Sequence, residues 1–170
     1  MKTRTIMAAV AVTLLAALAL VGSIGAQERA PMTHTIFVSA IEVKGGTTVD
    51  KLEPPSVNPH DMSKGYEFKA PGAADKNNPQ RWEVSSYMFA PAFVTVRQGD
   101  KVRVTAFVVN GEEHEVYITG PDGARVVPAT KWKRGREYHL EFTAETPGAY
   151  KLLCSNHAPS MNTTFFVLPR

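Results

Sequence analysis

The sequence predicts an all-β protein, folded as a sandwich or a barrel. Short stretches of alternating apolar and polar residues are separated by Gly-, Pro- and Asn-containing turns, at intervals of roughly eight to twelve residues. No stretch after the first 26 residues has the periodicity of an amphipathic helix. Without those residues about 145 remain, which is the size of one domain.

Residues 1–26 have the layout of a secretory signal peptide. Lys2 and Arg4 precede an apolar run from residue 6 to residue 20, and small residues follow up to Ala26. An uncleaved membrane anchor is the alternative interpretation, because residues 6–26 are long enough to cross a bilayer. In both cases we expect the folded part outside the cytoplasm, periplasmic or secreted, with membrane association only if the leader stays attached.

Nucleic acid is not an expected partner. Removal of Lys2 and Arg4 leaves 17 of the 19 basic residues against 16 acidic ones, so the mature chain is almost neutral. No basic run is interleaved with aromatic residues as a nucleic-acid groove requires. The nearest candidate, residues 131–136, is predicted to be a turn between two strands.

The rest of the chain divides into two parts. Residues 27–81 are expected to hold one strand and an irregular extension, and residues 82–170 the core of the sandwich. The first strand is predicted near 35–43, where apolar and polar residues alternate, and the pair Gly45-Gly46 would end it. We expect this strand to share one sandwich with the core.

Residues 51–79 are predicted to form an irregular surface excursion. They carry five of the chain's twelve prolines, each of which removes a hydrogen-bond donor from a strand. His60 and Met62 lie in this segment and could form a second metal site. A solvated loop is the interpretation we favour for them.

Strand patterns resume at residue 82. A break is expected at residues 90–92, around Pro91, and a strand over 101–109 would have basic residues on one face and Val or Ala on the other. The strands predicted in this part are 82–89, 93–96, 101–109, 115–118, 136–142, 148–153 and 162–168.

The only cysteine is one of three candidate metal ligands that lie in a single loop. Cys154, His157 and Met161 fall within eight residues, between the last two predicted strands. A thiolate and two imidazoles, with a long weak bond to a Met sulfur, form the ligand set of a blue-copper site. Taken singly, the three residues could be a buried apolar residue, a turn residue and a core residue. Their combination favours copper, and a bound metal would account for an unpaired cysteine in an exported chain.

The run from Phe142 to His157 resembles the C-terminal half of a cupredoxin. It has the form F-x-A-x-x-P-G-x-Y-x-x-x-C-x-x-H, and Met161 follows after three further residues. The resemblance covers about Tyr87 to Arg170 and includes the pattern P-x-F-V-x-V-x-x-G-D-x-V that begins at Pro91. The gap between His157 and Met161 is intermediate between plastocyanin-like and amicyanin-like loops.

The resemblance implies a second imidazole ligand at the head of an upstream strand. His114 occupies that position, forty residues before Cys154. The neighbouring Glu112 and Glu113 would also suit a solvated turn, and one of them could enter the coordination sphere. His139 is expected to face solvent or a neighbouring strand.

By this resemblance the fold is a cupredoxin-like Greek-key β-sandwich that binds one copper ion. The implied ligands are His114, Cys154, His157 and Met161, and the ion would cycle between Cu(I) and Cu(II). Such a protein passes single electrons from a donor redox protein to an acceptor, and we expect a carrier and not an enzyme.

The resemblance also implies how this site meets its partners. The imidazole edge of His157 would be exposed within an apolar docking patch, which Phe89, Pro91 and Phe93 could widen, although we expect at least one of the two Phe side chains to pack in the core. Hydrogen bonds to the thiolate from backbone amides and from Asn110 would tune the reduction potential, although Asn110 is equally suited to a simple turn.

Two other classes of protein stay open. Red-copper nitrosocyanins have a comparable N-terminal extension and lone-Cys loop and are linked to redox or nitric-oxide chemistry. They use a Glu at the upstream position and a second His downstream, whereas this chain has His114 and Met161. The other class is copper storage or delivery, or a structural zinc site. The visible absorption spectrum would distinguish all of these.

Overall fold

The computed structural model describes residues 29–48, 66–69, 77 and 81–170. The predicted leader lies outside these residues, and so do His60 and Met62. Within the described part, no helix is long and apolar enough to cross a membrane. The structure therefore bears on the sandwich and its site, whereas the leader remains a prediction from sequence.

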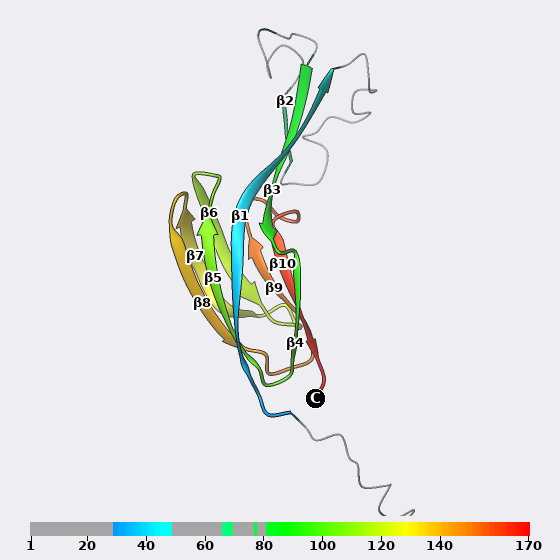
Figure 1. The fold of residues 1–170 in the computed structure, drawn as a ribbon, viewed down its shortest axis with the longest axis vertical. Helices are drawn as coiled ribbons and strands as arrows, with labels where there is room; N and C mark the ends of the chain where they lie inside the picture. The colour runs from blue at the N-terminus through cyan, green and yellow to red at the C-terminus, as the bar shows by residue number, and fades with distance from the viewer. Residues whose placement is uncertain (1–28, 49–65, 70–76, 78–80) are drawn as a thin grey trace, which may run out of the picture. The chain divides into compact units, whose positions relative to one another are not determined.

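The described residues form two five-stranded sheets, and the all-β prediction is confirmed (Figure 1). In sheet A the strand order is β2-β3-β1-β5-β8, and in sheet B it is β4-β10-β9-β6-β7. Neighbouring strands are antiparallel except for β1 with β5 and β4 with β10. The strands are β1 (Thr33–Thr48), β2 (Tyr66–Lys69), β3 (Arg81–Ala90), β4 (Phe93–Arg97), β5 (Lys101–Val108), β6 (Glu113–Thr119), β7 (Arg125–Lys133), β8 (Glu137–Thr143), β9 (Gly148–Cys154) and β10 (Asn162–Leu168).

The core follows from the alternation of side chains along each strand. In β5 every second residue is buried, as predicted, and the basic residues Lys101 and Arg103 lie on the outer face. Burial of one such Val, Leu or Phe side chain contributes about 1.5–3 kcal/mol. The fully buried large side chains are Trp132, Phe89, Phe165, Ile118, Leu152, Met161, His114, Val102, Val104, Val108, Val116 and Thr163.

The break predicted around Pro91 is the point at which the chain changes sheets. Strand β3 ends at Ala90 in sheet A, and β4 begins at Phe93 in sheet B. The Thr163 hydroxyl of β10 donates a hydrogen bond of 2.7 Å to the Pro91 carbonyl. This bond ties the crossing to the strand that follows the metal-ligand loop.

The predicted end of the first strand at Gly45-Gly46 is wrong. Strand β1 continues to Thr48, and Gly45 and Gly46 pair with Val84 and Glu83 of β3. Figure 1 shows β1 and β3 running on together beyond β5 and β8 of the same sheet. Pairing with a distant strand supplies the hydrogen bonds that outweigh the low strand propensity of glycine.

The prediction of an irregular excursion over 51–79 is wrong for one short piece. Residues 66–69 form β2, which pairs antiparallel with residues 83–86 of β3. Most of the remaining excursion lies outside the described residues. Local composition gave no strand here because a strand of four residues has little pattern of its own and depends on its pairing with β3.

Strand β7 was not predicted, and the assignment of residues 131–136 to a turn is wrong for Lys131–Lys133. Trp132, in that stretch, is fully buried and stacks on Tyr138 with ring centroids 5.1 Å apart. The strand contains Pro128 and pairs irregularly with β6. It is an edge strand of sheet B, where a proline costs no ladder hydrogen bond.

Candidate metal centre

His114 is a fully buried imidazole near the start of β6. Its Nε2 lies 2.8 Å from the carbonyl oxygen of Asn110. Because a carbonyl can only accept, Nε2 must carry the proton, and the lone pair is left on Nδ1. The turn at Gly111, whose φ is 84°, brings the carbonyl back to the ring. The hydrogen bond to Asn110 thus orients the His114 ring as a metal ligand requires, without any contribution from a metal.

Cys154 ends strand β9 and is also fully buried. In the register of sheet B it lies opposite Val116, so the ligand end of β6 and the ligand end of β9 meet. Burial raises the pKa of the Cys154 thiol, although the backbone amides of His157, Asn156 and Glu115 oppose that shift. The protein itself favours the thiol, and metal binding would have to displace its proton.

The loop between Cys154 and Met161 is closed by backbone hydrogen bonds. The amide of Cys154 donates to the Met161 carbonyl at 3.1 Å, and the Met161 amide donates to the His157 carbonyl at 3.0 Å. These bonds hold His157 above the end of the sandwich. Burial, together with the nearby His114, lowers the pKa of His157, which favours the neutral imidazole that binds a metal.

Three donor atoms converge at this end of the sandwich. The Nδ1 atoms of His114 and His157 are 3.2 Å apart, and the Cys154 sulfur lies 3.7 Å and 3.5 Å from them, respectively. A triangle with these sides has a circumradius of about 2 Å, which is close to the bond length from an imidazole nitrogen to a metal such as zinc. The three residues therefore form a group that could hold one metal ion. Their mixture of thiolate and imidazole suits copper.

Met161 is fully buried at the far end of the same loop. Its backbone takes part in loop closure, as described above. Its role as a weak axial ligand stays a prediction. The alternative ligands are less well placed: Glu112 is exposed, and Glu113 forms an ion pair of 2.8 Å with Lys131.

One aromatic ring covers the imidazoles and was missed from sequence. Tyr87 of β3 has its ring centroid 4.3 Å from that of His157 and 5.4 Å from that of His114. The only sequence signal was its position two residues before Phe89, on the inward face of the strand. Phe89 itself is fully buried in the core and does not widen a surface patch, whereas Phe93 is 69% exposed.

Asn110 acts on the site through its backbone. Its carbonyl accepts from His114, and its side-chain oxygen accepts a hydrogen bond of 3.2 Å from the amide of Glu42 in β1. These two contacts make it a structural link between β1 and the ligand.

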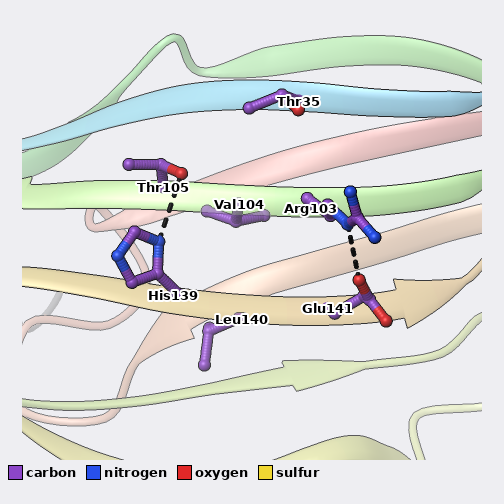
Figure 2. Close-up of a pocket in the computed structure, with 7 residues that line it drawn as sticks. All are labelled: Thr35, Arg103, Val104, Thr105, His139, Leu140 and Glu141. Atoms are coloured by element: carbon purple, nitrogen blue, oxygen red, sulfur yellow. Dashed lines mark hydrogen bonds and ion pairs between the residues drawn. The ribbon is translucent and has the colours of Figure 1, made fainter.

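His139 lies away from the three donor atoms. His139 of β8 is on the outer face of sheet A, where it hydrogen-bonds Thr105 at 3.3 Å beside the ion pair of Arg103 and Glu141 (Figure 2). The prediction that His139 faces solvent or a neighbouring strand is confirmed, because its side chain is exposed and contacts Thr105 of β5. The shallow hollow drawn in Figure 2 is therefore separate from the metal-ligand group.

No protein-family model matches the chain, and no curated protein matches its sequence. Solved structures do resemble its fold. Auracyanin from Roseiflexus castenholzii is 23% identical with a TM-score of 0.39, over 48% of this chain and 88% of that one. A purple cupredoxin from Nitrosopumilus maritimus is 19% identical with a TM-score of 0.35, over 48% and 82%.

Copper nitrite reductase from Nitrosomonas europaea matches over a longer part of this chain. It is 15% identical to this chain with a TM-score of 0.46, over 81% of this chain and 42% of that one. The chain therefore spans less than half of that enzyme. The two sheets and the Cys-His-His group confirm the predicted resemblance to cupredoxins. The protein has a cupredoxin-like fold and a site suited to copper.

Proposed function

We propose that this protein is an exported carrier of single electrons that binds one copper ion through His114, Cys154, His157 and Met161. The observation that carries the proposal is the triangle of donor atoms with sides of 3.2, 3.5 and 3.7 Å. Copper bound by such donors exchanges one electron between Cu(I) and Cu(II). A trigonal site of this kind serves electron transfer.

Several features of the chain favour a carrier over a catalyst. His114 and Cys154 are fully buried, and the ring of Tyr87 lies against both imidazoles. The His114 ring is oriented by Asn110 before any metal binds. A site that is closed and formed in advance leaves little room for a substrate and needs little rearrangement between oxidation states.

The visible spectrum of the copper-loaded protein tests this function. An intense band in the orange-red supports the proposal, and a band shifted to the blue would instead indicate a red-copper site. Absence of any thiolate-to-copper band would indicate zinc or a storage site for Cu(I). Replacing Cys154 by Ser should abolish the band, because the thiolate supplies the transition.

A matched control uses a histidine remote from the donors. His139→Ala removes an imidazole from the outer face of sheet A and should leave the band unchanged. A Cys154→Ser protein that keeps its colour contradicts the proposed centre.

Export and partners form the second part of the proposal. The leader-like residues 1–26 favour a periplasmic or secreted protein that meets separate donor and acceptor proteins. The exposed Phe93 and the half-buried His157 are candidates for the surface that these partners contact. The mass of the mature protein from its native host, together with cell fractionation, tests cleavage and location.

A further inference from the structure

Tyr87 comes from a part of the chain that supplies none of the donor atoms. It lies in β3, next to Glu42 of β1 in the sheet register. Its ring meets His157 at 4.3 Å with an interplanar angle of 38°, and it meets His114 edge-on at 5.4 Å and 66°. Ring contacts at these distances contribute about 0.5–1.5 kcal/mol each beyond area burial. The Tyr87 side chain of sheet A therefore touches both imidazoles, that of His114 in β6 and that of His157 in the loop between β9 and β10.

The position of the Tyr87 ring is tightly constrained. Phe89, two residues further along the same face of β3, is fully buried and meets Trp132 edge-on at 6.0 Å. On the other side lies Gly111, where a Cβ atom would come within 3.2 Å of the Tyr87 ring and 2.4 Å of His114 Nε2. The absence of a side chain at Gly111 lets the two rings approach each other. Gly111 therefore allows the Tyr87 ring to lie close to the His114 ring.

Of the three converging residues, His157 is the one that is only half-buried. Its ring is the route by which water or a small anion would reach the donor atoms, since His114 and Cys154 are fully buried. The Tyr87 ring lies against this imidazole. Loss of the ring would expose the imidazole and free it to rotate.

We propose that Tyr87 is a positioning residue that covers His157, holds its orientation and keeps water and small anionic ligands away from the metal. This inference rests on the proposed electron-carrier function and deepens it, because a covered site favours electron transfer over ligand binding. The planar ring makes both contacts with the imidazoles, and Tyr87→Phe keeps that ring.

The first test titrates azide into copper-loaded protein and follows the visible and electron paramagnetic resonance spectra. Tyr87→Ala should bind azide at least tenfold more tightly than the parent protein, and Tyr87→Phe should behave like the parent. Tyr117→Ala is the matched control, because it also removes a tyrosine ring, but from the face of β6 that is opposite to His114. Equal azide affinity in Tyr87→Ala and the parent, or equal gains in both Ala variants, overturns the proposal.

The second test needs no metal and separates failure of this inference from failure of the proposed function. Diethyl pyrocarbonate modifies accessible imidazoles, and peptide mass spectrometry reports the rate at each histidine. In apo protein, Tyr87→Ala should raise the rate at His157 several-fold and leave the rate at His139 unchanged. If Tyr87→Ala does not fold, Tyr87→Leu keeps an apolar side chain and serves the same comparison. An unchanged modification rate at His157 overturns the inference that Tyr87 covers this imidazole. A parent protein without a copper-thiolate band contradicts only the proposed function.

Discussion

The Ser155 hydroxyl donates a hydrogen bond of 2.6 Å to the Glu115 carboxylate across 40 residues of sequence. Glu115 follows His114, and Ser155 follows Cys154. The Ser155 amide also donates to the Glu115 carbonyl at 3.0 Å. This pair therefore joins the strand that carries one ligand to the loop that carries the others.

Glu115 should lower the reduction potential of the site. Burial is the main cause that raises the pKa of the Cys154 thiol, the nearby backbone amides oppose it, and the negative charge of Glu115 adds the smallest effect, in the same direction as burial. Negative charge near the donors favours the more positive copper ion. Glu115→Gln should raise the potential by tens of millivolts, on the order expected for a partly screened charge.

Voltammetry of the parent and variant at two salt concentrations measures this shift. Glu141→Gln is the control, since it removes the same charge from the outer face of sheet A, where Lys101 and Arg103 pair with it. A potential that moves equally in both variants would show that only net charge matters.

Met161 and His114 should differ in importance as ligands. An axial thioether is weak, so Met161→Ala should keep copper bound and change the potential. His114→Ala should open an equatorial position that added imidazole can fill, with recovery of the visible band. Copper content and spectra with and without imidazole provide the measurement. Equal loss of copper in the two variants would reverse this ranking of ligands.

Gly111 should be required for the metal centre for two separable reasons. Its φ of 84° disfavours any side chain, and a Cβ atom there would lie 2.4 Å from His114 Nε2. Gly123 has nearly the same φ, 82°, but nothing lies within 4 Å of its Cβ position. Both Gly→Ala variants should lose about 1 kcal/mol of stability from backbone strain.

Only Gly111→Ala should also weaken copper binding, by tenfold or more, because it displaces the His114 ring. Isothermal titration with copper, alongside urea unfolding, separates the two effects. Copper affinities that fall together in both variants would mean that strain alone disturbs the site.

Asp100 should stabilise the opposite end of the sandwich in a pH-dependent way. Burial alone would raise the pKa of this carboxyl, but the amides of Met32 and Arg97 and the His34 ring lower it to about 2 from its usual 3.8. Because the folded-state pKa is lowered, the stabilisation is present above about pH 4. It is lost as the pH falls through 2.

Asp100→Asn should therefore lower the free energy of unfolding at pH 7 by about 1–2 kcal/mol. The difference between variant and parent should disappear as the pH approaches 2. Urea unfolding across this pH range gives the comparison, with Asp122→Asn, in an exposed turn, as the control. A difference that stays constant down to pH 2 would show that the carboxylate charge is not responsible.

The local sequence pattern was sufficient to predict much of the fold and the residues that carry the metal-binding donor atoms. Alternation in β5 predicted which side chains are buried, and β10 was predicted at its observed bounds, 162–168. The short spacing of Cys154 and His157 predicted that they share a loop, and the family resemblance pointed to His114. These features are encoded within a few residues or within one recurrent motif.

Contacts between distant strands decided the rest. Strand β7 has weak alternation and a proline, yet it forms because Trp132 finds a core and β6 offers an edge. Strand β1 passes through Gly45 because β3 pairs with it. The cover of His157 by Tyr87 and the proton on His114 Nε2 depend on a ring and a carbonyl brought from other elements. Periodicity reports which face of an element is buried, but only the packed structure determines which side chain meets which across the interface.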